Sequence, residues 1–342
     1  MTTRIAGVPG VVPGLGALPL TGMAVVLASV SWTFLSAERT GGSPVRGAAT
    51  LVGAAVTFAA ARSLARGHPR LIPAVVVAVA AGLLATAFGD LVGGTTFGPF
   101  GYSNADAAFF TQAMVAAWMV ACATRSGPGR WIAFGAGLLF AFVPIAGGGR
   151  AVVVLFALAL AAMFAGGRGI PTKAVAVVGA GLFVAGVLVT VVLGATFEGE
   201  VSGDVDQLVD ATISTRRPEL WHDALVLIGE HPLTGVGPGR WAEESPSARA
   251  DADADQAHNA FLQQGAETGV VGMALLLLVV LWAFAYLASN AAGGAYAALG
   301  VAALTAFGLH ASIDYIFDFP AVVLTTAALV GAAGRGASIR GE

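Results

Sequence analysis

A histidine next to an asparagine is the first candidate for chemistry in this sequence. His258 and Asn259 stand at the start of a segment that leads into a long apolar run. An imidazole can accept a proton near neutral pH, and a neighbouring amide can orient it or a substrate hydroxyl. The alternative is a histidine at a helix start whose hydrogen bonds are satisfied within its own loop. The pair alone leaves both interpretations open.

Several arginines have the surroundings of an anion site. Arg150 follows three glycines inside an apolar stretch, and arginine near a bilayer is costly unless it pairs, snorkels or meets an anionic ligand. Arg217 follows Arg216 and precedes Pro218, a residue suited to the first turn of a helix, where guanidinium groups and free N–H groups can hold a phosphate. Arg240 lies on the glycine-rich stretch TGVGPGRW. For each, a snorkelling anchor or a solvated loop residue is the alternative.

The sequence predicts no metal site and no cofactor. The stretch DADAD at 251–255 resembles the start of a calcium loop, but Gln256 stands where that loop needs glycine and Leu262 stands where it needs a bidentate glutamate. The single cysteine, Cys122, excludes an intramolecular disulfide and a thiolate cluster. A serine hydrolase is also excluded, since no G-x-S-x-G element is present.

The elements that must position these residues are membrane helices. Of 342 residues, 57% are hydrophobic and 11% are charged, and the mean hydropathy is +0.82. An ordinary soluble domain carries roughly 25% charged residues. Apolar runs of about 20 residues cross a bilayer as helices, because lipid offers no partner for backbone groups. The sequence predicts an all-α polytopic membrane helix bundle with ten spans, near 18–37, 47–61, 71–89, 106–123, 131–146, 151–166, 174–195, 268–289, 295–313 and 317–333.

Charge placement predicts the orientation. With the N-terminus in the cytoplasm, the inside segments hold ten of the seventeen basic residues, and Glu342 is the only one of the twenty acids inside. This predicts a multi-pass protein with both termini cytoplasmic. The composition, rich in Ala, Gly and Val, suggests a bacterial source and therefore a bacterial inner (cytoplasmic) membrane. Three parts follow: a transmembrane bundle at 1–195, an extracytoplasmic loop domain at 196–267, and C-terminal spans with a short cytoplasmic tail at 268–342.

The long loop is expected to contain short helices. Residues 218–229 predict a helix that Pro232 stops, with an apolar stripe that suits a membrane surface or the roof of a cavity. The charged stretch 243–256 reads as a mobile loop and a candidate lid. The stretch HNAFLQQGAETG predicts a short helix that feeds the eighth span.

The order of these motifs resembles the O-antigen ligase and polymerase family, which comprises bacterial membrane glycosyltransferases of the C-type architecture. The resemblance rests on GPFGYSNADAAFF at 98–110, an arginine after glycines at 147–150, R-x-x-x-W from Arg217 to Trp221, HPLTGVGPG, and HNAFL followed by G-x-x-G into a span. Two features depart from the family pattern. Gly149 stands where a serine often precedes the arginine, and ten spans are predicted where twelve are common.

The resemblance implies transfer of a glycan from a polyprenyl diphosphate, such as undecaprenyl diphosphate, to an acceptor hydroxyl on a glycan, lipid or wall polymer. It implies that Arg150 and Arg217 bind the diphosphate and that His258 accepts or orients the proton of the attacking hydroxyl, without metal. Membrane lipids are the expected surroundings, and nucleic acid is not an expected partner. The further residues expected to contact substrate are Arg216, Arg240, Asn259, Trp221, Gly237 and Asn104.

Two other classes of function stay open at the level of sequence. A transporter or flippase of lipid-linked glycans also places charged groups near broken helices, although such folds often show internal repeats and none is evident here. The other is a family member that only scaffolds a polysaccharide assembly machine.

Overall fold

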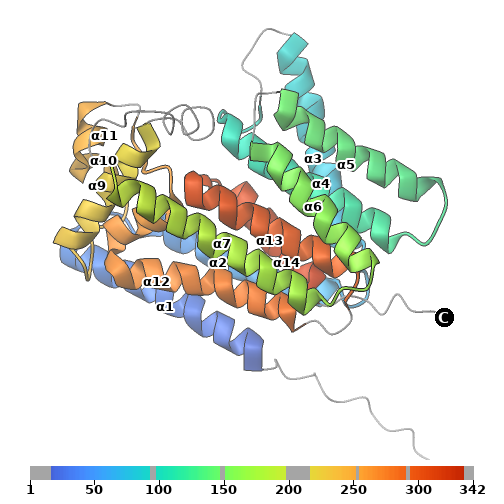
Figure 1. The fold of residues 1–342 in the computed structure, drawn as a ribbon, viewed down its shortest axis with the longest axis horizontal. Helices are drawn as coiled ribbons and strands as arrows, with labels where there is room; N and C mark the ends of the chain where they lie inside the picture. The colour runs from blue at the N-terminus through green and yellow to red at the C-terminus, as the bar shows by residue number, and fades with distance from the viewer. Residues whose placement is uncertain are drawn as a thin grey trace, which may run out of the picture.

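The computed structural model describes residues 17–92, 98–146, 151–197, 216–251, 254–289 and 293–334, and these contain helices and no strand (Figure 1). The predicted all-α class is therefore confirmed for this part of the chain. Ten apolar helices coincide with the ten predicted runs: α1 (Ala17–Thr40), α2 (Val45–Leu64), α3 (Leu71–Val92), α4 (Ser103–Ala123), α5 (Pro128–Ala146), α6 (Ala151–Gly167), α7 (Thr172–Ala195), α12 (Ala260–Ala288), α13 (Ala295–Ile313) and α14 (Pro320–Ala333).

Six of these helices are long and apolar enough to span a membrane: α1, α2, α4, α7, α12 and α13. The other four, α3, α5, α6 and α14, are apolar but shorter over their described hydrophobic stretches. The membrane character of the chain is confirmed. The count of ten spans stays a prediction.

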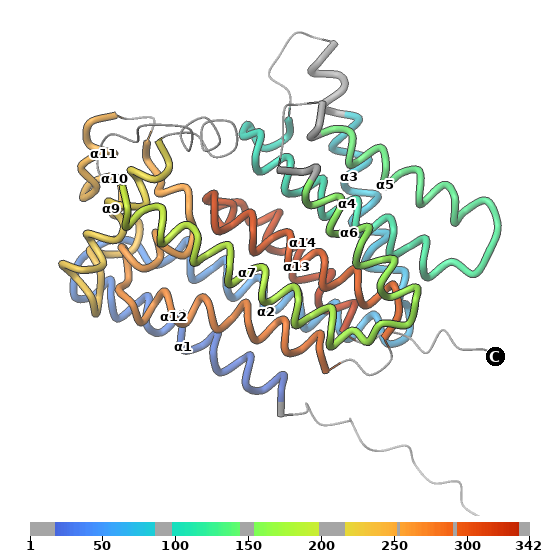
Figure 2. Tube along the Cα trace, viewed as in Figure 1, coloured from blue at the N-terminus to red at the C-terminus, as the bar shows by residue number. Residues whose placement is uncertain are grey.

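The core of the bundle is formed by α4 and α13. In each, 89% of the most apolar window is buried, against 17% in α1 and α2. Both helices are rich in alanine, whose small side chain lets neighbouring helices approach closely. Helix α13 contacts α4, α6, α7, α12 and α14, while α1 lies along α12 at the edge of the bundle (Figure 2). The C-terminal end of α13 is therefore held on several sides.

Three short helices cover one end of the bundle: α9 (Arg216–Glu230), α10 (Trp241–Glu244) and α11 (Pro246–Ala250) (Figure 1). The predicted helix at 218–229 is confirmed as α9. Its apolar stripe is buried against α7 and α12 in a small second core rather than exposed to a membrane surface. The stretch 243–256, expected as a mobile loop, contains the last two residues of α10 and all of α11. The Asp223 carboxylate accepts hydrogen bonds from the Ser245 hydroxyl and the Ser247 N–H.

Helix α12 is kinked at Gly269, where φ is 74° and ψ is 179°. This backbone conformation favours glycine. A side chain at this position would also collide with the carbonyl of Leu233, while the N–H of Val270 donates to the carbonyl of Pro232 at 2.8 Å. The loop after α9 thus crosses the helix at its kink. The predicted short helix before the eighth span is confirmed as the segment of α12 that precedes Gly269.

The link between α13 and α14 differs from the prediction. The tenth apolar run was placed at 317–333, but its first residues form a short 3-10 turn, η1 (Ile316–Asp318), and α14 begins at Pro320. Proline fits the first turn of a helix because its missing N–H would be unpaired there in any case. The turn keeps Asp314 and Asp318 outside both helices.

Candidate functional site

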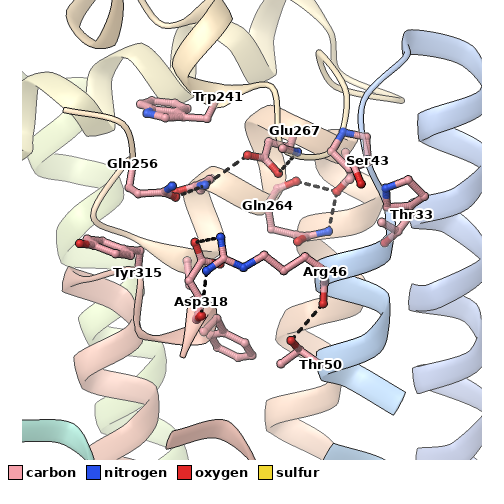
Figure 3. Close-up of a pocket in the computed structure, with 18 of the residues that line it drawn as sticks. Thr33, Ser43, Arg46, Thr50, Trp241, Gln256, Gln264, Glu267, Tyr315 and Asp318 are labelled. Atoms are coloured by element: carbon pink, nitrogen blue, oxygen red, sulfur yellow. Dashed lines mark hydrogen bonds and ion pairs between the residues drawn. The ribbon is translucent and has the colours of Figure 1, made fainter. Parts of the chain in front are cut away.

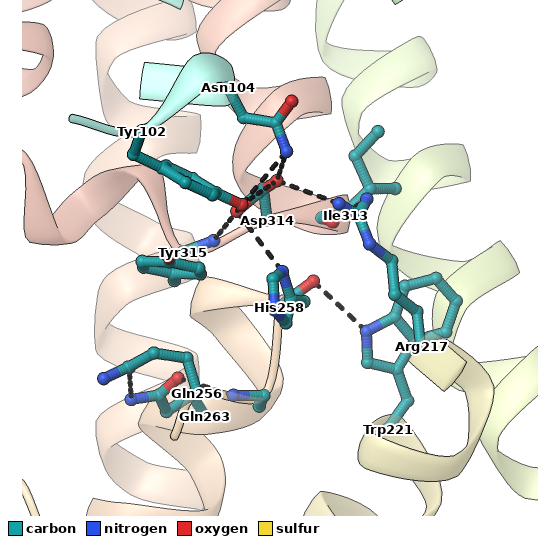
Figure 4. Close-up of polar contacts among 11 residues, drawn as sticks. Tyr102, Asn104, Arg217, Trp221, Gln256, His258, Gln263, Ile313, Asp314 and Tyr315 are labelled. Carbon is teal, nitrogen blue, oxygen red and sulfur yellow. Dashed lines mark hydrogen bonds and ion pairs between the residues drawn. The ribbon is translucent and has the colours of Figure 1, made fainter. Parts of the chain in front are cut away.

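The polar residues gather where α9 to α11 cover the bundle. The start of α4, the first turn of α9, the residues just before α12 and the end of α13 meet at one carboxylate, Asp314 (Figure 4). Asp314 directly follows α13, and its side chain is completely buried. A buried carboxylate is tolerated only where charges and hydrogen-bond donors surround it. The contacts of Asp314 therefore define the site.

Three neutral groups donate hydrogen bonds to Asp314. The Tyr102 hydroxyl lies 2.8 Å from Oδ1, the Asn104 amide nitrogen lies 2.5 Å from Oδ2, and the backbone N–H of Tyr315 lies 2.8 Å from Oδ1. Burial and the adjacent carboxylate raise the pKa of Tyr102, so its hydroxyl keeps its proton and remains a donor. Asn104, a residue predicted from the sequence, belongs to this site through the first turn of α4.

Arg217 supplies positive charge. One terminal nitrogen, Nη2, lies 3.1 Å from Oδ2 of Asp314, and Nη1 donates to the carbonyl of Ile313 at 2.6 Å. The side chain of Arg217 is 16% exposed, so its pair with Asp314 is largely removed from water. Ion pairs that are removed from water are the least screened by salt. A guanidinium has five N–H donors in a planar fork, and those not used here remain for an anionic ligand.

His258 lies between Asp314 and the loop helices with a constrained backbone. Its φ is 49°, and it is the only described residue other than glycine with a positive φ. Such a conformation costs about 1–3 kcal/mol and persists where the surroundings fix it. The ring packs edge-on against Tyr315 at 4.9 Å, and Nδ1 lies 3.6 Å from Oδ1 of Asp314. Within the described chain, Nδ1 has no hydrogen-bond partner at this distance.

Two residues expected to contact substrate hold the backbone of His258 in place. The indole N–H of Trp221 donates to the carbonyl of His258 at 3.2 Å, and Trp221 is fully buried. Asn259 is also fully buried and caps α12, because its Oδ1 accepts from the N–H groups of Phe261 and Leu262 at 3.0 Å each. The backbone around the imidazole is therefore fixed from both sides.

The site keeps Asp314 ionised. Burial raises the pKa of this carboxyl, but the nearby His258 and the positive charge of Arg217 outweigh burial and lower it to about 2. A carboxylate that is ionised at neutral pH stabilises positive charge on an adjacent imidazole. The arrangement therefore suits an imidazole that takes up a proton.

The other predicted residues lie away from this cluster. Arg240 binds Glu243 and Glu244 on its own loop and the carbonyl of Thr40, which ties the glycine-rich turn to the link between α1 and α2. Gly237 lies in the same turn with a φ of 118°, and a side chain there would collide with the carbonyl of Gly41. Arg216 forms an ion pair with Asp251. Arg150 lies outside the described residues.

A polar cavity of about 270 Å³ lies beside the cluster (Figure 3). It is bounded by the start of α2, the glycine-rich turn, the first part of α12 and the link between α13 and α14. Tyr315 lines the cavity and also packs against His258. The polar and aromatic residues that matter most in its lining are Arg46, Trp241, Gln256, Gln264, Glu267 and Asp318.

Asp314, Tyr102 and Tyr315 were missed from the sequence. Asp314 lies in HASIDYIFDFP, where two aspartates stand between two apolar runs. Ionisable residues at a membrane edge are costly, so the position of these two aspartates between apolar runs already indicates a functional role. Tyr102 lies two residues before Asn104, inside a motif already noted, but nothing local indicates that its hydroxyl reaches Asp314.

Among the residues that the structure describes, no group of three or more His, Cys, Asp or Glu side chains is placed to hold a metal ion. None of the curated proteins compared with the chain matches it. A family model described as O-antigen ligase matches residues 112–277, a segment that contains Arg217, Trp221 and His258. Over this segment, just under half of the chain, the resemblance to the O-antigen ligase and polymerase family is supported.

Proposed function

We propose that the protein is a membrane glycosyltransferase that moves a glycan from a polyprenyl-diphosphate donor to an acceptor hydroxyl. The family points to polysaccharide assembly at a membrane. The observation that carries the finer proposal is the placement of His258 against an ionised, buried Asp314, with Arg217 on the same carboxylate. This combines a proton acceptor with a cation for a diphosphate.

His258 is the proposed general base. Asp314 faces Nδ1 and would hold the ring through it, so that Nε2 is left to accept the proton of the acceptor hydroxyl. The 3.6 Å separation is longer than a hydrogen bond. Catalytic hydrogen bonds are often long before substrate binds and shorten in the reacting complex.

Arg217 is proposed to bind the diphosphate. In the reaction, the acceptor oxygen forms a new bond to the sugar carbon, and the bond between that carbon and the diphosphate oxygen breaks. The electron pair leaves with the diphosphate, and the acceptor proton passes to His258. A guanidinium within a largely buried site stabilises the charge that develops on the leaving group. Arg150 is the proposed second cation, and inversion by single displacement is the favoured course.

The apolar part of the bundle supports a lipid-linked substrate. A cavity of about 340 Å³, mostly apolar, lies between α1, α2, α12, α13 and α14. It shares Leu51 and Phe317 with the polar cavity beside the site. The hydrocarbon tail of a lipid-linked substrate fits this apolar space.

The proposal includes the topology predicted from the sequence. Ten spans would place both termini in the cytoplasm and the helices α9 to α11 on the extracytoplasmic face, within a loop domain at 196–267 between a bundle at 1–195 and C-terminal spans at 268–342. On that face the donor carries its own energy in the diphosphate linkage, so transfer needs no nucleotide.

The test is glycan transfer by the purified protein from an undecaprenyl-diphosphate-linked oligosaccharide in the presence of a chelator. The wild type should form product at a rate about 100-fold or more above those of His258→Ala, Arg217→Ala and Arg150→Ala. His231→Ala and Arg249→Ala are matched controls, because both side chains lie on the exposed surface. Absence of product from the wild type across several classes of acceptor would refute the proposal and favour lipid transport or scaffolding.

A further inference from the structure

The polar cavity contains hydrogen-bonding groups that the protein itself does not use. Gln263 donates to Oε1 of Gln256 at 2.6 Å, and Gln264 donates to the hydroxyl of Thr268 at 2.8 Å. Within the described part of the chain, the Gln256 amide nitrogen and the side-chain amide oxygen of Gln264 have no hydrogen-bond partner, whereas the backbone carbonyl of Gln264 accepts from the Thr268 hydroxyl at 2.6 Å. Trp241 is 1% exposed, and its indole N–H also lacks one there. A buried donor without a partner costs about 1–3 kcal/mol, so the cavity is incomplete without a ligand or water.

The charges of the cavity select against an anion. Asp255, Glu267 and Asp318 line it with carboxylates, while Arg46 is the one arginine among its lining residues. Arg46 is already engaged, since it donates to the carbonyl of Asp318 at 3.0 Å and lies 3.6 Å from that carboxylate. A diphosphate or an acidic sugar would meet more negative than positive charge here. An uncharged, hydroxyl-rich ligand would meet amide, carboxylate and indole partners.

The size and position of the cavity agree with one sugar residue. Its volume of about 270 Å³ lies just below the roughly 300–1,000 Å³ of pockets for drug-sized ligands. Tyr315 and Trp241 line the cavity (Figure 3), and Phe317 lines it as well. The ring of Tyr315 also packs edge-on against His258. A sugar held here lies beside the imidazole but away from Arg217.

We infer that this cavity is the acceptor subsite, that it binds a single uncharged sugar residue, and that it discriminates against acidic sugars. The inference rests on the proposed function, because the cavity is assigned to the acceptor only if the donor diphosphate binds at Arg217. The two substrates then approach His258 from different sides. Gln256, Gln264 and Trp241 supply the recognition of hydroxyl groups, and Asp255 and Asp318 supply the discrimination by charge.

The experiment measures binding of methyl glycosides to the full-length protein in nanodiscs of neutral lipid, by saturation-transfer NMR. The probes are methyl glucoside, methyl galactoside, methyl N-acetylglucosaminide and methyl glucuronide. At least one neutral glycoside should bind, and glucuronide should bind at least about tenfold more weakly than that probe. Gln264→Leu should weaken the neutral probe by about tenfold, the order of one lost hydrogen bond to a buried group.

Charge variants test the discrimination separately. Asp318→Asn should narrow the difference between the neutral and acidic probes, while Glu230→Asn, on the exposed surface, should leave it unchanged. If Gln264→Leu fails to fold, Gln256→Leu takes its place. The inference is overturned if no neutral glycoside binds, if glucuronide binds as well as the neutral probe, or if the glutamine variant binds like the wild type.

Failure of this inference is distinguishable from failure of the proposed function. His258→Ala should bind the neutral glycoside within about twofold of the wild type, because the imidazole does not line the cavity. If the wild type transfers glycan but binds no neutral glycoside, the acceptor subsite is refuted and the transferase stands. If the wild type binds the glycoside as expected but transfers nothing, the transferase is refuted and only a sugar-binding cavity remains.

Discussion

The Asp314 cluster and the polar cavity next to it lie on two sides of Tyr315. They differ in how far their polar groups are hydrogen-bonded within the protein. In the cluster, the fully buried carboxylate is surrounded by Tyr102, Asn104 and Arg217 at hydrogen-bond distance. In the cavity, Arg46 is 68% exposed, and the buried indole N–H of Trp241 has no partner among the described residues. Polar groups that satisfy one another fix geometry, whereas those left open are available to a ligand. The comparison assigns the positioning of His258 to the first region, where Arg217 also keeps N–H groups for the donor diphosphate, and recognition of the acceptor sugar to the second.

The largest effect is expected at the boundary between the two regions. His258→Ala should lower kcat by about 100-fold to 10,000-fold, the usual contribution of a positioned general base, and leave donor affinity nearly unchanged. Imidazole added to the assay should restore part of the rate. Initial rates with and without imidazole decide this, with His231→Ala as the control. An unchanged kcat would place the base elsewhere.

Arg217 should rank next. Arg217→Ala is expected to lower transfer by about 100-fold and also to reduce thermal stability, because Asp314 would lose its charged partner while remaining buried. Arg217→Lys keeps a charge but loses the planar fork, so it should recover stability more than activity. Thermal unfolding and kcat are measured on both variants. Equal recovery of both would reduce Arg217 to a structural role.

Asp314→Asn tests positioning directly. We expect a loss of about tenfold to 100-fold in kcat, or about 1.4–2.7 kcal/mol, with little change in KM for the glycoside part of an acceptor. The effect should be larger than that of Asp318→Asn, whose carboxylate lies in the cavity. If Asp318→Asn lowered kcat more than Asp314→Asn did, the assignment of the positioning role to Asp314 would be wrong.

The same carboxylate predicts a dependence of stability on pH. The pKa of Asp314 is about 2 in the folded protein, below the roughly 3.9 of an unfolded aspartate. The folded state therefore binds fewer protons, so this stabilisation is present above about pH 4 and is lost as the pH falls toward 2. Wild type and Asp314→Asn are compared by thermal unfolding between pH 6 and pH 3 at constant ionic strength. A parallel pH dependence in both would contradict the assignment.

The smallest effect is expected at Arg240. Its partners lie on its own loop and on the link between α1 and α2, and its side chain is 31% exposed. Arg240→Ala should lower stability by about 1 kcal/mol or less and change kcat by less than about threefold. A large loss of transfer with an unchanged melting temperature would instead support the substrate contact expected from the sequence.

The sequence predicts the helices of this fold better than the connections between them. Apolar runs placed all ten apolar helices, and the proline signals at Pro218 and Pro232 bracketed α9. His258 and Arg217 were found because their residue types are unusual beside apolar segments. Asp314 was missed because its partners Tyr102 and Arg217 lie 212 and 97 residues away in the sequence. The roles of Trp221 and Asn259 also depend on which side of the imidazole each one occupies, and local spacing does not contain that information.

The most direct test is a double-mutant cycle on His258 and Asp314, with the rate of glycan transfer from an undecaprenyl-diphosphate-linked donor as the measured quantity. If Asp314 acts by holding the imidazole, the double variant His258→Ala with Asp314→Asn should be no slower than His258→Ala alone, because the carboxylate has nothing left to position. If the two losses multiply, the residues act independently, and the account of a base held by Asp314 is wrong.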